Sequence, residues 1–202
     1  MMKFYKLLFL LFVSFNIFAV SVDTGHANVS LVKYNFSENG VEQNLIGIKM
    51  DMQKNWHTYW KNPGDSGGPI KVKWSHEEDL AISEIFWPTP SLIPYDPLMT
   101  YGYKDFVIFP FKFENSGTIN APITADIDFL ICDDICVPEK AYIETTIDEI
   151  VTDINLQQWF AMVPTQTLPA KVSIDNNLSL IHISEPTRLR RISYAVFGLK
   201  KK

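Results

Sequence analysis

Short stretches in which hydrophobic and polar residues alternate recur along the middle of this chain. Hydrophobic side chains fall on every second residue in 45–52, 106–113 and 124–131, the period that places them on one face of a β-strand. Weaker alternation or short apolar runs predict further strands at 29–36, 70–74, 82–87 and 142–150. No long segment has the helical period, so the one helix we expect is short and lies within 154–162.

Segments rich in glycine and proline separate these predicted strands. Residues 61–69 hold two prolines and three glycines, a density typical of a turn. Proline cannot donate a ladder hydrogen bond, so an extended segment with few such bonds is predicted around Pro88, Pro90, Pro94 and Pro97. Seven or eight short strands with no helices between them predict an all-β fold, an immunoglobulin-like antiparallel β-sandwich.

The two ends of the chain differ from this domain. Residues 1–21 contain a short basic region, an apolar run at 7–18 and small residues at Ala19 and Ser21, the layout of a signal peptide. An uncleaved membrane anchor is the alternative, although the run is shorter than the ~20 apolar residues of a span. Residues 178–202 resemble translated sequencing adapter, with a natural basic tail as the alternative.

These features predict the domain organisation and the charge of the mature chain. We expect the sandwich domain at 22–150, a linker or the start of a truncated downstream region at 151–177, and an adapter-derived artefact at 178–202. Eight of the 18 Lys and Arg residues but one of the 23 Asp and Glu residues lie in the two excluded ends. The net charge therefore changes from −5 to about −12, which argues against nucleic acid as a partner.

The chain has two cysteines, Cys132 and Cys136, at the end of the predicted strand 124–131. Residues four apart in an extended strand are ~13 Å apart, whereas a disulfide requires Cα atoms within about 4.4–6.8 Å. A bonded pair therefore requires the chain to reverse within 133–135, in a three-residue hairpin loop or a single helical turn. Export to an oxidising compartment would allow such a bond to form and persist.

Side chains alternate between the two faces of the predicted strand 124–131, so the two faces have different roles. Cys132 is predicted to face outward or towards a covering loop, because the opposite face should be core. A structural disulfide in a sandwich more often joins the two sheets, and closing so short a loop adds little stability. The spacing thus favours a redox pair, although the charges of Asp133 and Asp134 would disfavour its thiolates. The predicted core residues are Ala125, Ile127, Phe129 and Ile131.

Other candidate residues give weaker signals. His57 could complete a copper or zinc site with the cysteines, but two soft ligands and one distant histidine are not specific, so we expect no metal. The tetrapeptide 65–68 (DSGG) is similar to serine-hydrolase loops, but no His–Asp pair in a suitable context accompanies it. The aromatic residues of the segment 56–60 and Trp74 are expected to be core unless they line the cysteine site.

Four motifs occur in one order along the chain: 56–67 (WHTYWKNPGDSG), 87–90 (WPTP), 101–103 (YGY) and 132–138 (CDDICVP). Together they resemble the amino-terminal periplasmic domain of the DsbD thiol:disulfide interchange family, over about residues 29–147. The branch they resemble most includes suppressor-of-copper-sensitivity proteins and the disulfide bond corrector domain. The better-known domains space their cysteines more widely, and this chain has neither membrane helices nor a thioredoxin-like Cys-x-x-Cys.

The resemblance implies a periplasmic immunoglobulin-like domain whose cysteine pair relays reducing equivalents without a cofactor. In the family, electrons arrive through a membrane domain and a thioredoxin-like domain. They then pass to periplasmic thioredoxin-fold proteins, namely disulfide isomerases or cytochrome c maturation thioredoxins. The alternative function is of a different class: a secreted β-sandwich binding module whose short disulfide only stabilises a hairpin.

The resemblance also implies roles for individual residues. Cys132 and Cys136 match the redox pair, with Cys136 as the sulfur attacked to form a mixed disulfide. Tyr59 occupies the place where the family has an aromatic residue beside the pair. The stretch 98–102 resembles the cap loop over the sulfurs, and its candidate covering residues are Leu98, Met99 and Tyr101.

Overall fold

A computed structural model describes residues 21–38, 40–76, 80–95, 97–115, 122–165, 170–175 and 178–183. The chain divides into two units, residues 1–163 and 164–202. The predicted signal peptide lies outside the described residues, apart from Ser21, so its presence stays a prediction. No helix of the described residues is long and apolar enough to cross a membrane.

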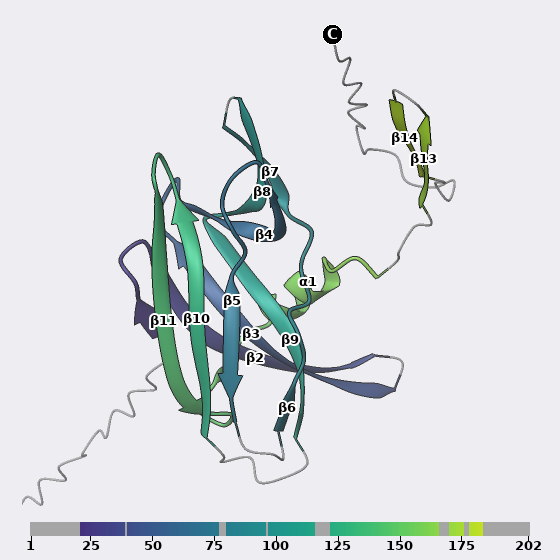
Figure 1. Cartoon of the computed structure of the whole chain (residues 1–202). Coiled ribbons are helices and arrows are strands. Elements are labelled where there is room, and N and C mark those ends of the chain that lie inside the picture. The colour runs from purple at the N-terminus through teal and green to yellow at the C-terminus, as the bar shows by residue number, and fades with distance from the viewer. Residues whose placement is uncertain are drawn as a thin grey trace, which may run out of the picture. The chain divides into compact units, whose positions relative to one another are not determined.

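The first unit is built on two sheets whose strands face each other across a common core (Figure 1). In the first sheet the order is β1-β2-β3-β9-β6, with the short β12 parallel to β2. In the second it is β11-β10-β4-β8-β7, with β5 pairing with β10. All other pairs are antiparallel, which confirms the predicted all-β, immunoglobulin-like sandwich.

The bounds of the strands are as follows. The first sheet contains β1 (Ser21–Asp23), β2 (Ala27–Glu38), β3 (Val41–Met52), β6 (Leu80–Ile82), β9 (Phe106–Asn115) and β12 (Val151–Thr152). The second contains β4 (His57–Gly64), β5 (Lys71–Ser75), β7 (Ser91–Tyr95), β8 (Leu98–Lys104), β10 (Pro122–Cys132) and β11 (Cys136–Thr146).

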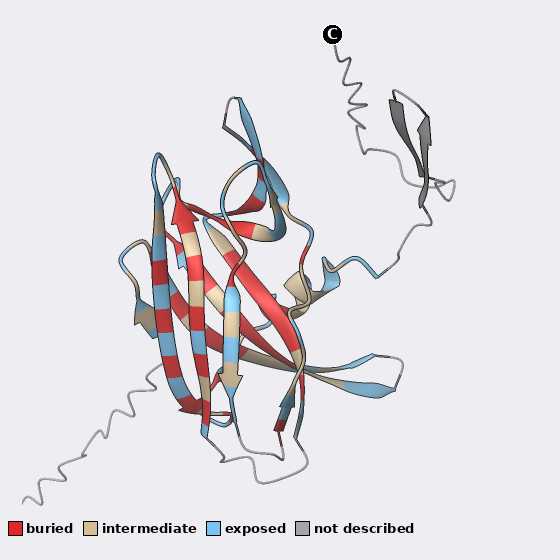
Figure 2. Ribbon diagram, viewed as in Figure 1, coloured by how far each residue is buried: buried red, intermediate tan, exposed pale blue. Residues whose placement is uncertain are grey.

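The core lies between the two sheets, where the hydrophobic side chains of alternating residues meet. Buried and exposed residues alternate along β11 (Figure 2), as expected for strands with one face in the core. Phe109 is fully buried and contacts the rings of Trp87 and Tyr103 edge to face. The four residues of β10 predicted to be core are all buried: Ala125, Ile127, Phe129 and Ile131.

Two predictions about the proline-rich region were wrong. Residues 91–95 form β7 and pair with β8, with Pro94 opposite Met99; the proline is tolerated because β7 is the last strand of its sheet. A strand is predicted at 82–87, whereas the strand in the structure, β6, ends at Ile82. Beyond it, Phe86 still donates a backbone hydrogen bond to Pro110 of β9, but a proline cannot donate one in return, so no regular ladder continues.

A short helix, α1 (Asn155–Ala161), extends the first unit past the domain end predicted at residue 150. Leu156 of this helix is fully buried with Val32, Leu45 and Ile108. The approach is close: a Cβ atom on Gly47 would lie 2.7 Å from Leu156 Cδ1. The helix within 154–162 is confirmed, and it belongs to the sandwich unit, which ends at residue 163.

The second unit contains one described hairpin, β13 (Ala170–Asp175) paired with β14 (Leu178–Ile183). Residues 184–202 lie outside the described residues. The adapter origin of 178–202 stays a prediction.

Candidate redox site

A disulfide joins the two strands of the β10–β11 hairpin at its loop. Cys132 ends β10, Cys136 begins β11, and the two residues are direct partners in the ladder. Their sulfurs are bonded, with Cα atoms 4.2 Å apart. The Asp133 N–H donates to the Ile135 carbonyl at 3.1 Å, so the chain reverses in a three-residue hairpin loop, one of the two reversals that the spacing allowed.

The two cysteines differ in their access to solvent. Cys132 is 1% exposed, whereas Cys136 is exposed. Two orientations were predicted for Cys132, outward or towards a covering loop. The first was wrong, because Cys132 is buried. A neighbouring strand provides the cover: β4 pairs with the end of β10, with His57 opposite Cys132, and this places Tyr59 beside the sulfurs.

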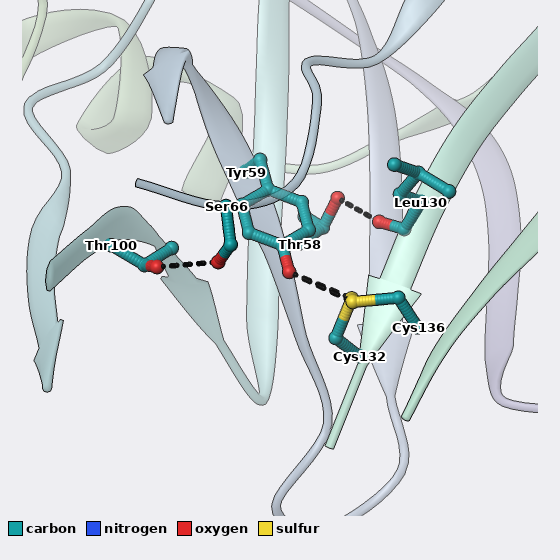
Figure 3. The surroundings of a disulfide bond; sticks show 7 residues. All are labelled: Thr58, Tyr59, Ser66, Thr100, Leu130, Cys132 and Cys136. Atoms are coloured by element: carbon teal, nitrogen blue, oxygen red, sulfur yellow. Dashed lines mark hydrogen bonds between the residues drawn. A yellow bond between two sulfur atoms is a disulfide. The ribbon is translucent and has the colours of Figure 1, made fainter. Parts of the chain in front are cut away.

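Tyr59 is fully buried, and its hydroxyl contacts both sulfurs (Figure 3). The hydroxyl donates a hydrogen bond to Cys132 Sγ at 2.7 Å and lies 3.3 Å from Cys136 Sγ. Burial raises the pKa of Tyr59, against a smaller opposing effect of the nearby Ser66 hydroxyl. The phenol therefore remains protonated at neutral pH and is available as a donor to sulfur.

The segment that follows β4 packs behind the Tyr59 ring. Gly67 has a φ of +85°, and a Cβ atom there would lie 2.2 Å from the Tyr59 ring. The neighbouring Ser66 Oγ lies 3.0 Å from Thr100 Oγ1 of β8. Asp65 fixes the same segment to β8 twice: its N–H donates to the Met99 carbonyl, and its carboxylate accepts from the Met99 N–H. The loop is therefore held between Tyr59 and the β7–β8 hairpin.

The candidate cap residues lie in a strand, not in a loop. Leu98, Met99 and Tyr101 belong to β8, and each is about 40% exposed. Thr100 of the same strand contacts Ser66, with 3.0 Å between Thr100 Oγ1 and Ser66 Oγ. A shielding role for Leu98, Met99 and Tyr101 stays a prediction.

His57 contributes to the surroundings of Tyr59. It is buried, and its ring meets the Tyr59 ring edge to face at 5.3 Å. Burial and the nearby charge of Lys104 lower the pKa of His57, and Asp133 opposes them. Among the described residues, no three histidine, cysteine, aspartate or glutamate side chains are grouped so that they could hold a metal ion.

The lowered pKa of His57 predicts a pH dependence of stability. The unfolded chain, with a pKa near 6.5, binds the proton more readily than the folded domain, so stability is fully present above this pH and decreases as pH falls below it. We expect His57→Gln to flatten this part of the profile of unfolding free energy against pH, measured by urea unfolding. Lys104→Gln should weaken the dependence and Asp133→Asn should strengthen it. If the slope of unfolding free energy against pH is the same in His57→Gln as in the parent, the pH dependence does not come from His57.

A buried carboxylate fixes β11 three residues beyond Cys136. Glu139 is 7% exposed and accepts hydrogen bonds from the Thr24 hydroxyl and from His26 Nδ1, the latter at 2.5 Å. The His26 ring in turn stacks on Trp56, which directly precedes β4. This cluster ties the start of β11 to the β1–β2 turn, so it supports the hairpin that holds the disulfide.

Three residues of the site were not recognised from sequence. Ser66 and Gly67 belong to the DSGG tetrapeptide, whose likeness to hydrolase loops gave no indication of a place behind Tyr59. Thr100 lies within the stretch 98–102, but the candidate residues chosen from that stretch were its neighbours Leu98, Met99 and Tyr101. Their positions depend on the pairing of β4 with β8, in which the register shifts between Tyr59 and Gly64.

Comparisons with known proteins identify the fold and the family of this chain. A similar solved structure is that of the N-terminal periplasmic domain of ScsB from Proteus mirabilis, at 18% sequence identity and a TM-score of 0.60, covering 81% of this chain and 67% of that one. At this identity the similarity shows the fold. No curated protein matches the chain significantly. The model of the family described as thiol:disulfide interchange protein DsbD, N-terminal, matches residues 29–147. The chain, with its cysteine pair bonded in the matched region, therefore belongs to the family of DsbD amino-terminal domains.

Proposed function

We propose that this domain is a periplasmic thiol–disulfide exchange module that relays reducing equivalents through Cys132 and Cys136. The observation that carries the proposal is the unequal exposure of the two sulfur-bearing residues: Cys136 is exposed and Cys132 is buried beneath Tyr59. Exchange begins when a thiolate reaches one sulfur of a disulfide. The accessible residue, Cys136, is therefore the one attacked, and Cys132 is the one released.

Reduction of the domain's disulfide by a partner then takes two steps. A thiolate of a reduced partner attacks Cys136 Sγ, a mixed disulfide forms, and Cys132 leaves with the electron pair of the broken bond. The partner's second thiolate attacks the partner's own sulfur in the mixed disulfide, which releases Cys136. The domain has then gained two electrons and the partner has become a disulfide. Delivery to an oxidised partner repeats these steps in the reverse direction.

The partners that we propose are proteins with a thioredoxin fold. The donor would be the thioredoxin-like domain that DsbD-type proteins supply with electrons through a membrane domain. The acceptors would be disulfide isomerases or cytochrome c maturation proteins of the periplasm. The family match supports this class of partner, and the similarity to the ScsB structure, which is that of a periplasmic domain, supports the compartment.

Trapping of mixed disulfides tests the proposal. In Cys132→Ser the exposed Cys136 can attack a partner's disulfide, and no second cysteine remains in the domain to resolve the product. We expect this variant, exported to the periplasm, to accumulate adducts that migrate as larger species on non-reducing gels and disappear with dithiothreitol. Cys136→Ser retains the buried cysteine and should accumulate far less.

The double serine variant is the control for adducts that do not involve the pair. The binding-module alternative predicts a different result: neither single variant captures a partner, and the disulfide has the potential of a structural bond, below about −300 mV, whereas an exchanging pair lies well above this value. That combination would contradict the relay.

A further inference from the structure

The hairpin loop 133–135 lies beside the exposed cysteine of the pair. In a mixed disulfide the Cα atoms of the two bonded cysteines are about 4.4–6.8 Å apart, and consecutive Cα atoms of one chain are about 3.8 Å apart. A partner bonded to Cys136 must therefore contact the residues next to it. Ile135 is 68% exposed and Asp134 is exposed as well, so both side chains are available for that contact.

Apolar side chains border Cys136 on both sides along the chain. Ile135 directly precedes it, and Pro138, two residues beyond it on the same face of β11, is exposed. The loop lies at the end of the β10–β11 ladder (Figure 1). Because β11 is the last strand of its sheet and no described strand pairs with its outer side, a partner can approach Cys136 there and cover Ile135.

Two carboxylates accompany these apolar side chains. Asp133 is half-buried and Asp134 is exposed, and aspartate carries a negative charge at neutral pH. The salt bridges formed among the described residues include neither of them. Their charge therefore acts on a group that approaches Cys136. It attracts basic groups and repels acidic ones within the Debye length, about 8 Å at physiological ionic strength.

We propose that the loop 133–135 is the recognition element of the exchange site, and that it selects a partner whose reactive cysteine is bordered by apolar and basic side chains. Ile135 supplies an apolar contact, and Asp133 and Asp134 supply charge complementarity, which favours encounter with a basic partner and disfavours an acidic one. The inference rests on the proposed exchange function and names the surface that this function requires of the partner.

Activated peptides test the inference without a natural partner. In a Cys132→Ser background, Cys136 is the single thiol. Its thiolate attacks the cysteine sulfur of a short peptide whose cysteine is bonded to thionitrobenzoate. A disulfide forms between Cys136 and the peptide, and the thionitrobenzoate leaves as a yellow anion with the electron pair of the broken bond. The absorbance of this anion measures the rate, and four peptides place lysine, glutamate, leucine or glycine on both sides of the cysteine.

The ratio of the rates with the lysine and glutamate peptides measures selection by charge. We expect this ratio to be about 3- to 10-fold larger in the reference protein than in Asp133→Asn/Asp134→Asn, as expected for a few exposed charge pairs. Differences in the reactivity of the peptides, and in that of Cys136 between variants, cancel in this comparison. In 1 M salt, where the Debye length is about 3 Å, most of the difference should disappear.

The ratio of the rates with the leucine and glycine peptides measures the apolar contact. Ile135→Ala should lower this ratio by about 3-fold or more, because less apolar surface is buried between the loop and the peptide. Its dependence on salt should be small. Ile135→Val retains most of the side chain and should retain most of the selectivity.

Matched substitutions elsewhere in the domain are the controls. Asp126 is an exposed carboxylate six residues before Cys132 in β10, about 20 Å away, and Asp126→Asn should leave the charge ratio unchanged. Ile154 is 58% exposed at the start of α1, and Ile154→Ala should leave the apolar ratio unchanged. Circular dichroism confirms folding of each variant. Either ratio that stays at the reference value in its loop variant overturns the inference.

The outcome is independent of partner capture in cells. Selectivity towards the peptides that the loop variants lose, without trapped partners, would support recognition by the loop and count against the relay. Trapped partners, with ratios that the loop variants do not change, would support the relay and refute recognition by the loop.

Discussion

Gly67→Ala is expected to destabilise the domain by about 2–4 kcal/mol, the combined cost of a left-handed backbone and an overfilled site. Gly67 has a φ of +85°, where an L-residue is strained, and its Cβ would lie 2.2 Å from the Tyr59 ring. Tyr59 is fully buried, and its hydroxyl is held against the sulfurs by a hydrogen bond. The substitution must therefore distort either the loop or the contact with the disulfide.

The adjacent glycine provides a matched control. A Cβ on Gly68 would lie 3.5 Å from Leu130 Cδ1, an ordinary contact, and its φ is not positive. Gly68→Ala should be neutral or slightly stabilising, because alanine restricts the unfolded chain more than glycine does. Urea unfolding of the oxidised proteins measures both effects. Equal stabilities of the two variants would show that the Tyr59 ring is not held by Gly67.

A chain that ends at Ile150 is expected to be about 3–5 kcal/mol less stable than one that ends at Val163, since a fully buried leucine alone is worth about 1.5–3 kcal/mol. The shorter chain loses α1 and with it the cover of Val32, Leu45 and Ile108. It also loses Trp159, whose ring packs edge to face on Tyr103 and Phe106. Denaturant unfolding of the two chains measures the difference.

Single substitutions assign this effect to the helix. Leu156→Ala should remove about 2–5 kcal/mol, because Leu156 is fully buried. Ile154→Ala changes a similar apolar side chain that is 58% exposed, and it should cost no more than about 0.5 kcal/mol. If the two chain lengths are equally stable, the helix does not belong to the folding unit, and the domain end predicted from the sequence would be the correct one.

Much of the fold could be predicted because strand faces and turns are local properties. The alternation in 124–131 identified β10 and its core face, since successive residues of a strand point to opposite sides. The spacing of Cys132 and Cys136 limited the reversal between them to two forms. The proline-rich region was misjudged because the prohibition on proline depends on whether a strand is central or at an edge, and sequence does not reveal the position of Pro94 at the edge of a sheet.

The sequence by itself determined the sandwich class and limited the reversal between the two cysteines to two forms, and its motifs pointed to Tyr59. Only the tertiary structure decided that Cys132 is the buried cysteine, that Tyr59 donates a hydrogen bond to its sulfur, and that Gly67 packs against the Tyr59 ring. The physical reason is distance along the chain: Tyr59 and Cys132 are 73 residues apart. Periodicity fixes which face of a strand is apolar, whereas the choice of neighbouring strand and its register depends on packing of the whole core.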